Sequence, residues 1–286
     1  MTPLTTPSPP LAIEAVFPEL AGLARTTVRL HPRRGHPTAL DSSIGGPLLW
    51  PSDEAWPECP VPETHDPSEG TDPLPLVPAA QLYARDVPEL PFPDGTDLLQ
   101  VLWCPVEHGD FFVPHPVLFW RKAESIVAPL LEMPEPGPDV DDFYVPRPCV
   151  LAPERVLEYP DGWELPDSLR DRIRAWERSP DNPEGWHYFS HLSVAPGSKV
   201  AGHVDWHQDP WPATCAQGHL MSHLLTLSDW EMDIEGERRW KPIEERHRHF
   251  GDLQCPPDWN IHGGGSLSLF ICLDCPDRPV DYMAHR

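Results

Sequence analysis

Short apolar segments separated by turn residues make up most of the hydrophobic pattern of the chain. They lie at residues 26–30, 76–82, 98–103, 187–194, 220–227 and 267–272. Segments of this length are typical of β-strands, and the alternation of apolar and polar side chains in 187–194 predicts a half-buried strand. Residues 111–120 also resemble a strand, but Pro114 and Pro116 remove backbone donors, so we expect it at a sheet edge.

A helical pattern is clear in residues 167–178, where apolar side chains fall on one face and Asp167 has the side chain of an N-cap residue. Residues 11–24 predict a short or broken helix, because Pro18 interrupts the apolar spacing. The 41 prolines of the chain disfavour long helices, since each fixes φ and removes a donor. The pattern predicts an α+β fold that consists mostly of short antiparallel strands.

Two stretches of the chain share one framework of Gly, Trp, Pro and Cys. Gly46 and Gly202 each lie four residues before a Trp, and a Trp-Pro pair and a Cys follow in both stretches. Further on, residues 99–104 match residues 267–272, and both segments end in a Cys nine residues after a Gly. Two matches in the same order predict an internal duplication. We therefore expect two pseudo-symmetric halves with equivalent residues in equivalent places.

Composition along the chain divides it into four parts. We expect a disordered tail at 1–10, a first repeat half at 11–128, a Pro-rich and helical connection at 129–186, and a second repeat half at 187–286. In the second half, residues 267–272 form the predicted closing strand, and residues 276–286 are a polar tail.

The chain is strongly acidic, with 45 acidic and 21 basic residues and a formal net charge of -24. This charge argues against nucleic-acid binding through phosphate contacts, whereas it would attract a basic protein partner. The same charge favours a soluble monomer. Residues 1–10 lack the features of a signal peptide, and no segment is apolar enough to span a bilayer, so we expect a cytoplasmic protein without membrane contact.

In the cytoplasm, seven cysteines are better candidates for metal ligands than for disulfides. Cys272 and Cys275 form a C-x-x-C turn at the end of a strand, which can present two thiolates to one tetrahedral Zn²⁺. Cys215 and His219 follow the Trp-Pro pair of the same half. Together these four residues predict a Cys₃His zinc site in the second half.

The first half offers a Cys₂His₂ set, Cys59, His65, Cys104 and His108, at the corresponding places. A structural zinc in each half would stabilise this loop-rich chain, because such ligands can contribute on the order of 10 kcal/mol to folding. The alternative is that Cys104 and Cys272 are only small apolar residues that end core strands.

A different metal centre is also compatible with the sequence. His203, Asp205 and His262 have the order of a 2-His-1-carboxylate triad, which leaves open positions on Fe(II) for oxygen chemistry. Against it, Pro47 and Leu49 occupy the positions of His203 and Asp205 in the first repeat, where a ligand role makes no sense. The chain contains no nucleophile elbow, P-loop or dinucleotide fingerprint.

The repeated motifs resemble those of the YwqG-like family of bacterial proteins of unknown function. The matching residues are Ser43-Ile44-Gly45-Gly46-Pro47, Trp50-Pro51, Trp56-Pro57, Ala80-Gln81-Leu82, Val200-Ala201-Gly202-His203 and Trp206-His207-Gln208. The resemblance covers most of residues 11–276 and implies a duplicated α+β cytoplasmic fold without an established chemistry, with some members near toxin and immunity systems. The chain departs from the family at Ala201, where a second Gly is usual, and in its additional Cys and His residues.

These observations predict a non-enzymatic cytoplasmic binding or regulatory protein with structural zinc. Its acidic surface would engage a basic partner, and an immunity-type inhibitor of a basic toxin or nuclease is one concrete form of this function. The alternative is a metal-dependent enzyme, with iron at His203, Asp205 and His262 or with a zinc that keeps an open position.

Overall fold

The computed structural model describes residues 3–66, 70, 72–109, 112–137, 140, 142–207, 209–261 and 263–285. The fold contains two six-stranded sheets. Every pairing between the named strands of the described chain is antiparallel. The predicted α+β class with short antiparallel strands is confirmed.

Neighbouring strands in each sheet are often far apart in the chain. From one edge to the other, sheet A contains β12 (Val280–His285), β11 (Ser266–Ile271), β10 (Ser222–Ser228), β9 (Lys199–Val200), β1 (Arg25–Arg29) and β8 (Glu154–Glu158). Sheet B contains, in the same manner, β2 (Arg33–Arg34), β7 (Cys149–Val150), β3 (Ser43–Ile44), β4 (Val77–Tyr83), β5 (Leu98–Trp103) and β6 (Pro116–Arg121).

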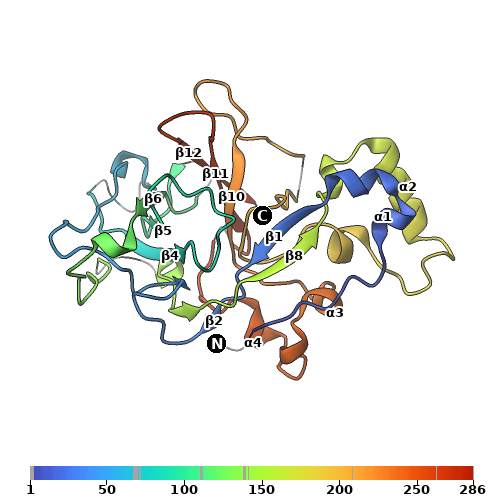
Figure 1. Ribbon diagram of the computed structural model, residues 1–286, viewed down its shortest axis with the longest axis horizontal. Helices are drawn as coiled ribbons and strands as arrows, with labels where there is room; N and C mark the ends of the chain where they lie inside the picture. The colour runs from blue at the N-terminus through green and yellow to red at the C-terminus, as the bar shows by residue number, and fades with distance from the viewer. Residues whose placement is uncertain are drawn as a thin grey trace.

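The helices are short. The α-helices are α1 (Ile13–Val16), α2 (Asp167–Glu177), α3 (Glu237–Trp240) and α4 (Gly251–Gln254). In the view of Figure 1, α1 and α2 lie at one end of the molecule, beyond β1 and β8, and α3 and α4 lie below the sheets. The 3₁₀ turns are η1 (Pro18–Leu23), η2 (Pro62–Thr64), η4 (Ala123–Ser125), η5 (Asp142–Tyr144), η6 (Gly162–Glu164) and η8 (Ile243–Glu245), and η7 (Tyr188–Leu192) is a π-helical turn. Among the described residues, no helix has the length and apolar character needed to cross a membrane.

The two sheets have the same strand order when the first six strands are matched with the last six. β3 to β6 follow one another across sheet B as β9 to β12 do across sheet A. If β1–β6 and β7–β12 are taken as the two halves, each half gives its first strand to the sheet of the other, because β1 pairs with β9 and β7 pairs with β3. This crossed arrangement joins the halves into one unit.

Strand register supports the same matching. The β4–β5 pairing is interrupted between Pro78 and Ala80, and the β10–β11 pairing is interrupted between His223 and Leu225, which are the matched positions. The topology is therefore what a copied unit would give. The ancestry of the two halves remains a prediction.

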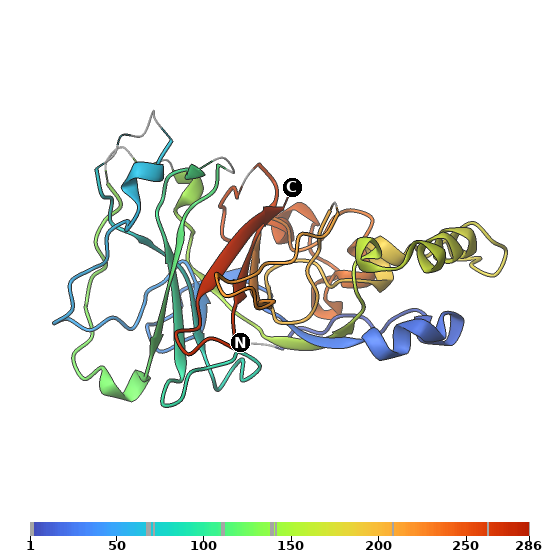
Figure 2. The same ribbon diagram turned by 90° about the horizontal axis from the view of Figure 1, so that it is seen from above.

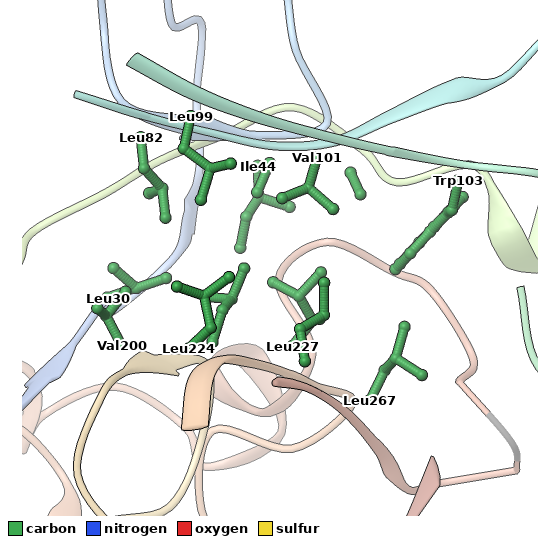
Figure 3. Packing of buried hydrophobic residues seen from close by; sticks show 14 of the residues in the cluster. Leu30, Ile44, Leu82, Leu99, Val101, Trp103, Val200, Leu224, Leu227 and Leu267 are labelled. Atoms are coloured by element: carbon green, nitrogen blue, oxygen red, sulfur yellow. The ribbon is translucent and has the colours of Figure 1, made fainter. Parts of the chain in front are cut away.

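The main core lies between the two sheets. In Figure 3, side chains of β4 and β5 such as Leu82 and Leu99 point toward Leu224 and Leu227 of β10, and all four are buried. Each buried aliphatic side chain of this kind contributes about 1.5–3 kcal/mol relative to an exposed one. The inward positions of both sheets thus form one shared core.

A second apolar cluster holds the helical end of the molecule together, which projects to one side in Figure 2. Helix α2 buries Leu169 and Ile173 on the predicted face, against residues of α1 and η1. The helix itself is confirmed, although Pro166 occupies the N-cap position and Asp167 is the first helical residue. Residues 11–24 form a broken helix, α1 followed by η1, as predicted.

The strand predicted at 187–194 is wrong, since this segment forms the π-helical turn η7. The backbone N–H of Ser193 donates to the Tyr188 carbonyl at 2.8 Å, and the Ser193 hydroxyl donates to the Phe189 carbonyl at 2.8 Å. His191 Nδ1 accepts from the backbone N–H of His187 at 2.9 Å. Local polar side chains therefore satisfy the backbone without a strand partner, and the alternating pattern was misleading.

Three other segments differ from the expectation. The polar tail contains the edge strand β12, whose Tyr282 and Ala284 pack against the main core. The connection 129–186 contains β7 and β8, one in each sheet. In the tail predicted to be disordered, Thr6 is buried and its hydroxyl accepts from Arg29 Nη1 at 2.8 Å.

The edge-strand prediction for 111–120 agrees with the structure from Pro116 onward. β6 (Pro116–Arg121) lies at the edge of sheet B, where the missing proline donor is tolerated. Phe111 lies outside the described residues.

Substitution of Gly202 tests how closely the chain is packed at the repeated Gly-Trp framework. Its φ is +80°, and a Cβ at this position would lie 2.0 Å from Glu158 Oε1 and 2.7 Å from Thr27 Cβ. We expect Gly202→Ala to lower the free energy of unfolding by about 2–4 kcal/mol, from left-handed strain and the steric clash together. Urea denaturation measures the difference.

Gly95→Ala is the matched control for this substitution. Gly95 has a φ of +81°, but its Cβ would meet nothing within 4 Å. It should lose only about 1–2 kcal/mol from backbone strain. Equal losses in the two variants would show that the close approach of Gly202 to Glu158 has no energetic weight.

The outer face of sheet A carries buried polar side chains. Beside them lies the half-buried His223, whose Nδ1 is 3.0 Å from the Ala201 carbonyl and whose Nε2 is 2.8 Å from Thr226 Oγ1. Burial, followed by the charge of Lys199, lowers the pKa of His223 from 6.5 to about 3. The imidazole is therefore neutral in the folded chain at every pH above this value.

This shift predicts acid sensitivity. Between pH 6.5 and pH 3 the unfolded chain binds a proton at His223 that the folded chain does not bind, so stability falls as the pH falls. At pH 5 the loss from this group should be about 2 kcal/mol. Urea denaturation at pH 7 and pH 5 should show a smaller acid loss for His223→Gln than for the unchanged chain. Identical losses in both proteins would contradict the prediction.

Two candidate metal centres

Two clusters of Cys and His side chains lie at matched places of the two halves. The first cluster is Cys59, His65, Cys104 and His108, and the second cluster is Cys215, His219, Cys272 and Cys275. In each half, two of the residues come from the loop between the third and fourth matched strands and two follow the fifth strand. The structure thus brings together both sets that the sequence indicates, and each could hold a metal ion.

The first cluster is fully buried. The Nε2 atom of His65 lies 3.4 Å from the sulfur of Cys59 and 3.4 Å from that of Cys104, and His108 Nε2 lies 3.8 Å from the Cys59 sulfur. All four candidate ligand atoms lie within 4.8 Å of one another. Cys104 directly follows β5, and the turn after it brings His108 back beside His65.

Hydrogen bonds fix both imidazoles of the first cluster in one tautomer. The Thr64 hydroxyl donates to the Val61 carbonyl at 2.9 Å, so its oxygen accepts the proton of His108 Nδ1 at 2.8 Å. His65 Nδ1 donates to the Gly70 carbonyl at 3.2 Å. Both Nε2 atoms therefore carry a free lone pair that faces the sulfurs. Metal-ligating histidines are usually oriented by such partners on the second nitrogen.

The second cluster uses the other imidazole nitrogen. His219 Nδ1 lies 3.7 Å from the Cys272 sulfur and 3.4 Å from the Cys275 sulfur, and the sulfurs of Cys215 and Cys275 are 3.8 Å apart. A tight turn links the loop residues, because the N–H of Cys215 donates to the His219 carbonyl at 3.0 Å. Gly218, with a φ of +82°, makes this turn possible.

These separations match the edges of a tetrahedron around zinc. With Zn–S near 2.3 Å and Zn–N near 2.05 Å, tetrahedral angles place two sulfurs about 3.8 Å apart and a sulfur and a nitrogen about 3.6 Å apart. The sulfur–nitrogen contacts of the two clusters range from 3.4 to 3.8 Å. The 3.8 Å between Cys215 and Cys275 is too long for a disulfide, whose S–S bond is about 2.05 Å.

The thiols of each cluster affect one another's ionisation. The contact with Cys104 lowers the pKa of Cys59 to about 3, and the contact with Cys59 raises the pKa of Cys104 far above its usual range. Burial raises the pKa of Cys275 to about 12. Burial also raises the pKa of Cys215, but backbone N–H groups and neighbouring thiols bring it to about 7. A dication between the sulfurs would allow all of them to ionise.

Each cluster has a tryptophan of the repeated framework beside it. Trp50 packs in one buried group with Cys59 and Cys104, and Trp206 packs in another with Cys215 and Cys272. Both tryptophans are at most 5% exposed. The matched residues thus occupy matched environments, as a duplicated chain requires.

The alternative iron triad finds little support in the contacts of His203. Its Nε2 donates to the Leu23 carbonyl at 2.8 Å, and its Nδ1 lies 3.6 Å from Glu164 Oε2. Both ring nitrogens therefore face protein groups. Asp205 pairs instead with His207, at 3.3 Å between Oδ2 and Nε2. His262 lies outside the described residues, so the complete triad remains untested.

Sequence reasoning missed the groups that orient the ligands. Thr64 and the Gly70 carbonyl hold the imidazoles of the first cluster, and only the folded loop brings them to the ring nitrogens. A hydroxyl residue next to a candidate ligand is too common in proteins to serve as a signal.

The fold and the site define a two-sheet α+β protein with one candidate metal centre in each half. No protein-family model matches the chain, and no curated protein matches it. The resemblance to the YwqG-like family therefore remains a prediction.

Proposed function

We propose that each cluster binds one structural Zn²⁺, through two thiolates and two imidazoles in the first half and three thiolates and one imidazole in the second. The observation that carries this proposal is that the candidate ligand atoms of each set of four lie within 4.8 Å of one another. Cys and His are the usual ligands of structural zinc, and four protein ligands leave no open position for substrate. The sites are therefore structural and not catalytic.

The proposal includes the ancestry of the chain. A unit that contained six strands, a Gly-Trp framework and one metal site was copied, and the first strands of the copies were exchanged between the sheets. The matched strand orders, bulges, tryptophans and clusters support this history. The ligand sets then diverged, because His108 and Cys275 fill the same corner with different donors.

Metal analysis tests the proposal directly. We expect protein purified without a His tag to contain about two zinc ions per chain, and Cys104→Ser and Cys272→Ser each to contain about one. Cys255→Ser is the control, since Cys255 belongs to neither cluster and its sulfur donates to the Trp259 carbonyl. Two zinc ions in every variant, or iron in place of zinc, would contradict the assignment.

On this stabilised scaffold we place a non-enzymatic binding role, in which the acidic surface engages a basic protein, for example as an immunity-type inhibitor. The net charge of -24 supports this role, because such a field accelerates encounter with a basic partner. An identified partner should be basic and its association rate should fall steeply as salt is raised. Partners that are acidic, or binding that is independent of salt, would exclude this role.

A further inference from the structure

A cavity of about 420 Å³ lies against the outer face of sheet A, in the second half. Its sheet side is formed by four small hydroxyl residues of β10 and β11, and segments 189–197 and 230–254 contribute much of the remaining lining. The four residues are Thr226, Ser228, Ser266 and Ser268. Cavities of this size accept small organic molecules.

The matched strands of sheet B carry larger side chains at the same four positions. By strand register, the counterparts of Thr226, Ser228, Ser266 and Ser268 are Gln81, Tyr83, Leu98 and Gln100, and all of these are buried. The Leu49 N–H donates to Gln81 Oε1 at 2.8 Å, and Gln100 Nε2 donates to the Leu49 carbonyl at 2.9 Å. The two glutamines thus fill the space and satisfy the backbone in front of the sheet.

Asp205 takes the place of Leu49 in the second half. Both residues precede the framework tryptophan, and Asp205 lines the cavity. The exchange of four large side chains for small ones therefore coincides with the introduction of a carboxylate. A packing defect alone would explain the cavity, but it would not explain a carboxylate at the same place.

The hydrogen bonds around the cavity leave mainly this carboxylate to bind a ligand. Thr226 Oγ1 lies 3.0 Å from Ser268 Oγ, and the Ser228 hydroxyl donates to the Trp230 carbonyl at 2.9 Å. Lys199 also lines the cavity, but its Nζ lies 3.0 and 2.7 Å from the two carboxylate oxygens of Glu158. Its charge is therefore balanced within the protein.

Asp205 presents a partly exposed carboxylate to the cavity. Its side chain is 34% exposed, and its Oδ2 lies 3.3 Å from His207 Nε2, whereas its Oδ1 is buried. Burial, with the charge of Asp205, raises the pKa of neighbouring Asp161 to about 6. Burial also raises the pKa of Asp205, but its contacts with His207 and Asp161 and the charge of Lys199 together hold this pKa below its usual value. Asp233 adds a second carboxylate to the lining.

Another part of the lining is apolar and aromatic. It includes Phe189, Trp230, Met232 and Phe250. Aromatic faces attract organic cations as well as apolar groups, by about 0.5–2 kcal/mol. The lining therefore combines a partly exposed carboxylate with these aromatic side chains, which we call the aromatic wall.

We propose that this cavity binds a small organic cation, a primary amine on a flat apolar body, with the ammonium group at Asp205 and the body against the aromatic wall. The site is separate from both metal clusters and exists only in the second half, where the matched side chains are small. It gives the protein a small-molecule ligand in addition to its binding role.

Calorimetric titration of the zinc-loaded chain with benzylamine, benzyl alcohol and benzoate tests the charge preference. We expect benzylamine to bind at least about tenfold more tightly than benzyl alcohol, the equivalent of about 1.4 kcal/mol, and benzoate not to bind. Equal affinities for amine and alcohol, a preference for benzoate, or no binding of benzylamine would overturn the proposal.

Two variants locate the binding. Asp205→Asn should weaken benzylamine binding about tenfold, because it removes the charge and keeps the size. Ser268→Gln, which introduces the side chain of the matched position in the first half, should abolish binding by filling the cavity. Asp171→Asn is the control, since this carboxylate is 76% exposed on α2. Unchanged affinity in either cavity variant, with the zinc content and circular dichroism of the unchanged chain, would place the amine elsewhere.

Discussion

Removal of zinc is expected to abolish cooperative folding of the chain at 25 °C. Structural zinc contributes about 10–16 kcal/mol to the folding of small zinc-binding peptides at neutral pH, whereas a whole domain is usually stable by only about 5–15 kcal/mol. Loss of two such ions would therefore exceed the stability of most domains. Thermal unfolding followed by circular dichroism, with and without a strong chelator, measures the effect.

Metal replacement distinguishes lost coordination from a direct effect of the chelator. Added Zn²⁺ should restore the unfolding transition, whereas Mg²⁺ should not, because it prefers oxygen ligands. The second cluster should lose its metal first, since His219 is partly exposed and all four residues of the first cluster are buried. A transition unchanged after complete zinc removal would reject a structural role for both sites.

The candidate ligands could be predicted from the sequence because similar motifs in two stretches of the chain indicate their positions twice. Cys104 and Cys272 each directly follow a strongly apolar strand, so their location was predictable from local pattern. The pairing of either one with a Cys in the preceding loop depends on matched landmarks. A single copy would have given only a C-x-x-C turn and scattered histidines.

The exchange of β1 and β7 between the two sheets could not be predicted from local sequence pattern. β7 has two residues and β8 alternates weakly, yet they pair with strands more than a hundred residues away. Only non-local pairing gives these short segments an extended structure. For the same reason, the sequence suggested a connection where the structure has two strands.

The outer face of sheet A shows a second limit of pattern reasoning. Alternating Ser266 and Ser268 in β11 indicate a strand with one face in water, but both residues are buried. Segments distant in sequence cover this face, and Thr226 and Ser268 lie within hydrogen-bond distance of each other. The cavity beside Asp205 arises from this cover, which no local pattern predicts.

Lys199→Met is expected to lower the free energy of unfolding by about 3–5 kcal/mol, measured by urea denaturation. Lys199 and Glu158 are both at most 1% exposed, and Glu158 also accepts the backbone N–H groups of Ala195 at 2.7 Å and His203 at 2.5 Å. Methionine would keep the packing and leave a buried carboxylate without its cation. Burial lowers the pKa of Lys199, and the charge and hydrogen bonds of Glu158 oppose this effect.

Two further variants separate this loss from a general effect of lost charge. Lys122→Met breaks a pair with Glu124 in which both side chains are more than half exposed, so its loss of stability should be far smaller than that of Lys199→Met. In Lys199→Met/Glu158→Gln the unpaired charge is gone, so the loss should be clearly smaller than the sum of the two single losses. Additive losses would mean that each side chain is needed separately and that the pair is not a unit. A small loss for Lys199→Met alone would mean that water reaches and solvates the Glu158 carboxylate. The close packing of Gly202 against this carboxylate would then not be explained by the need to exclude water.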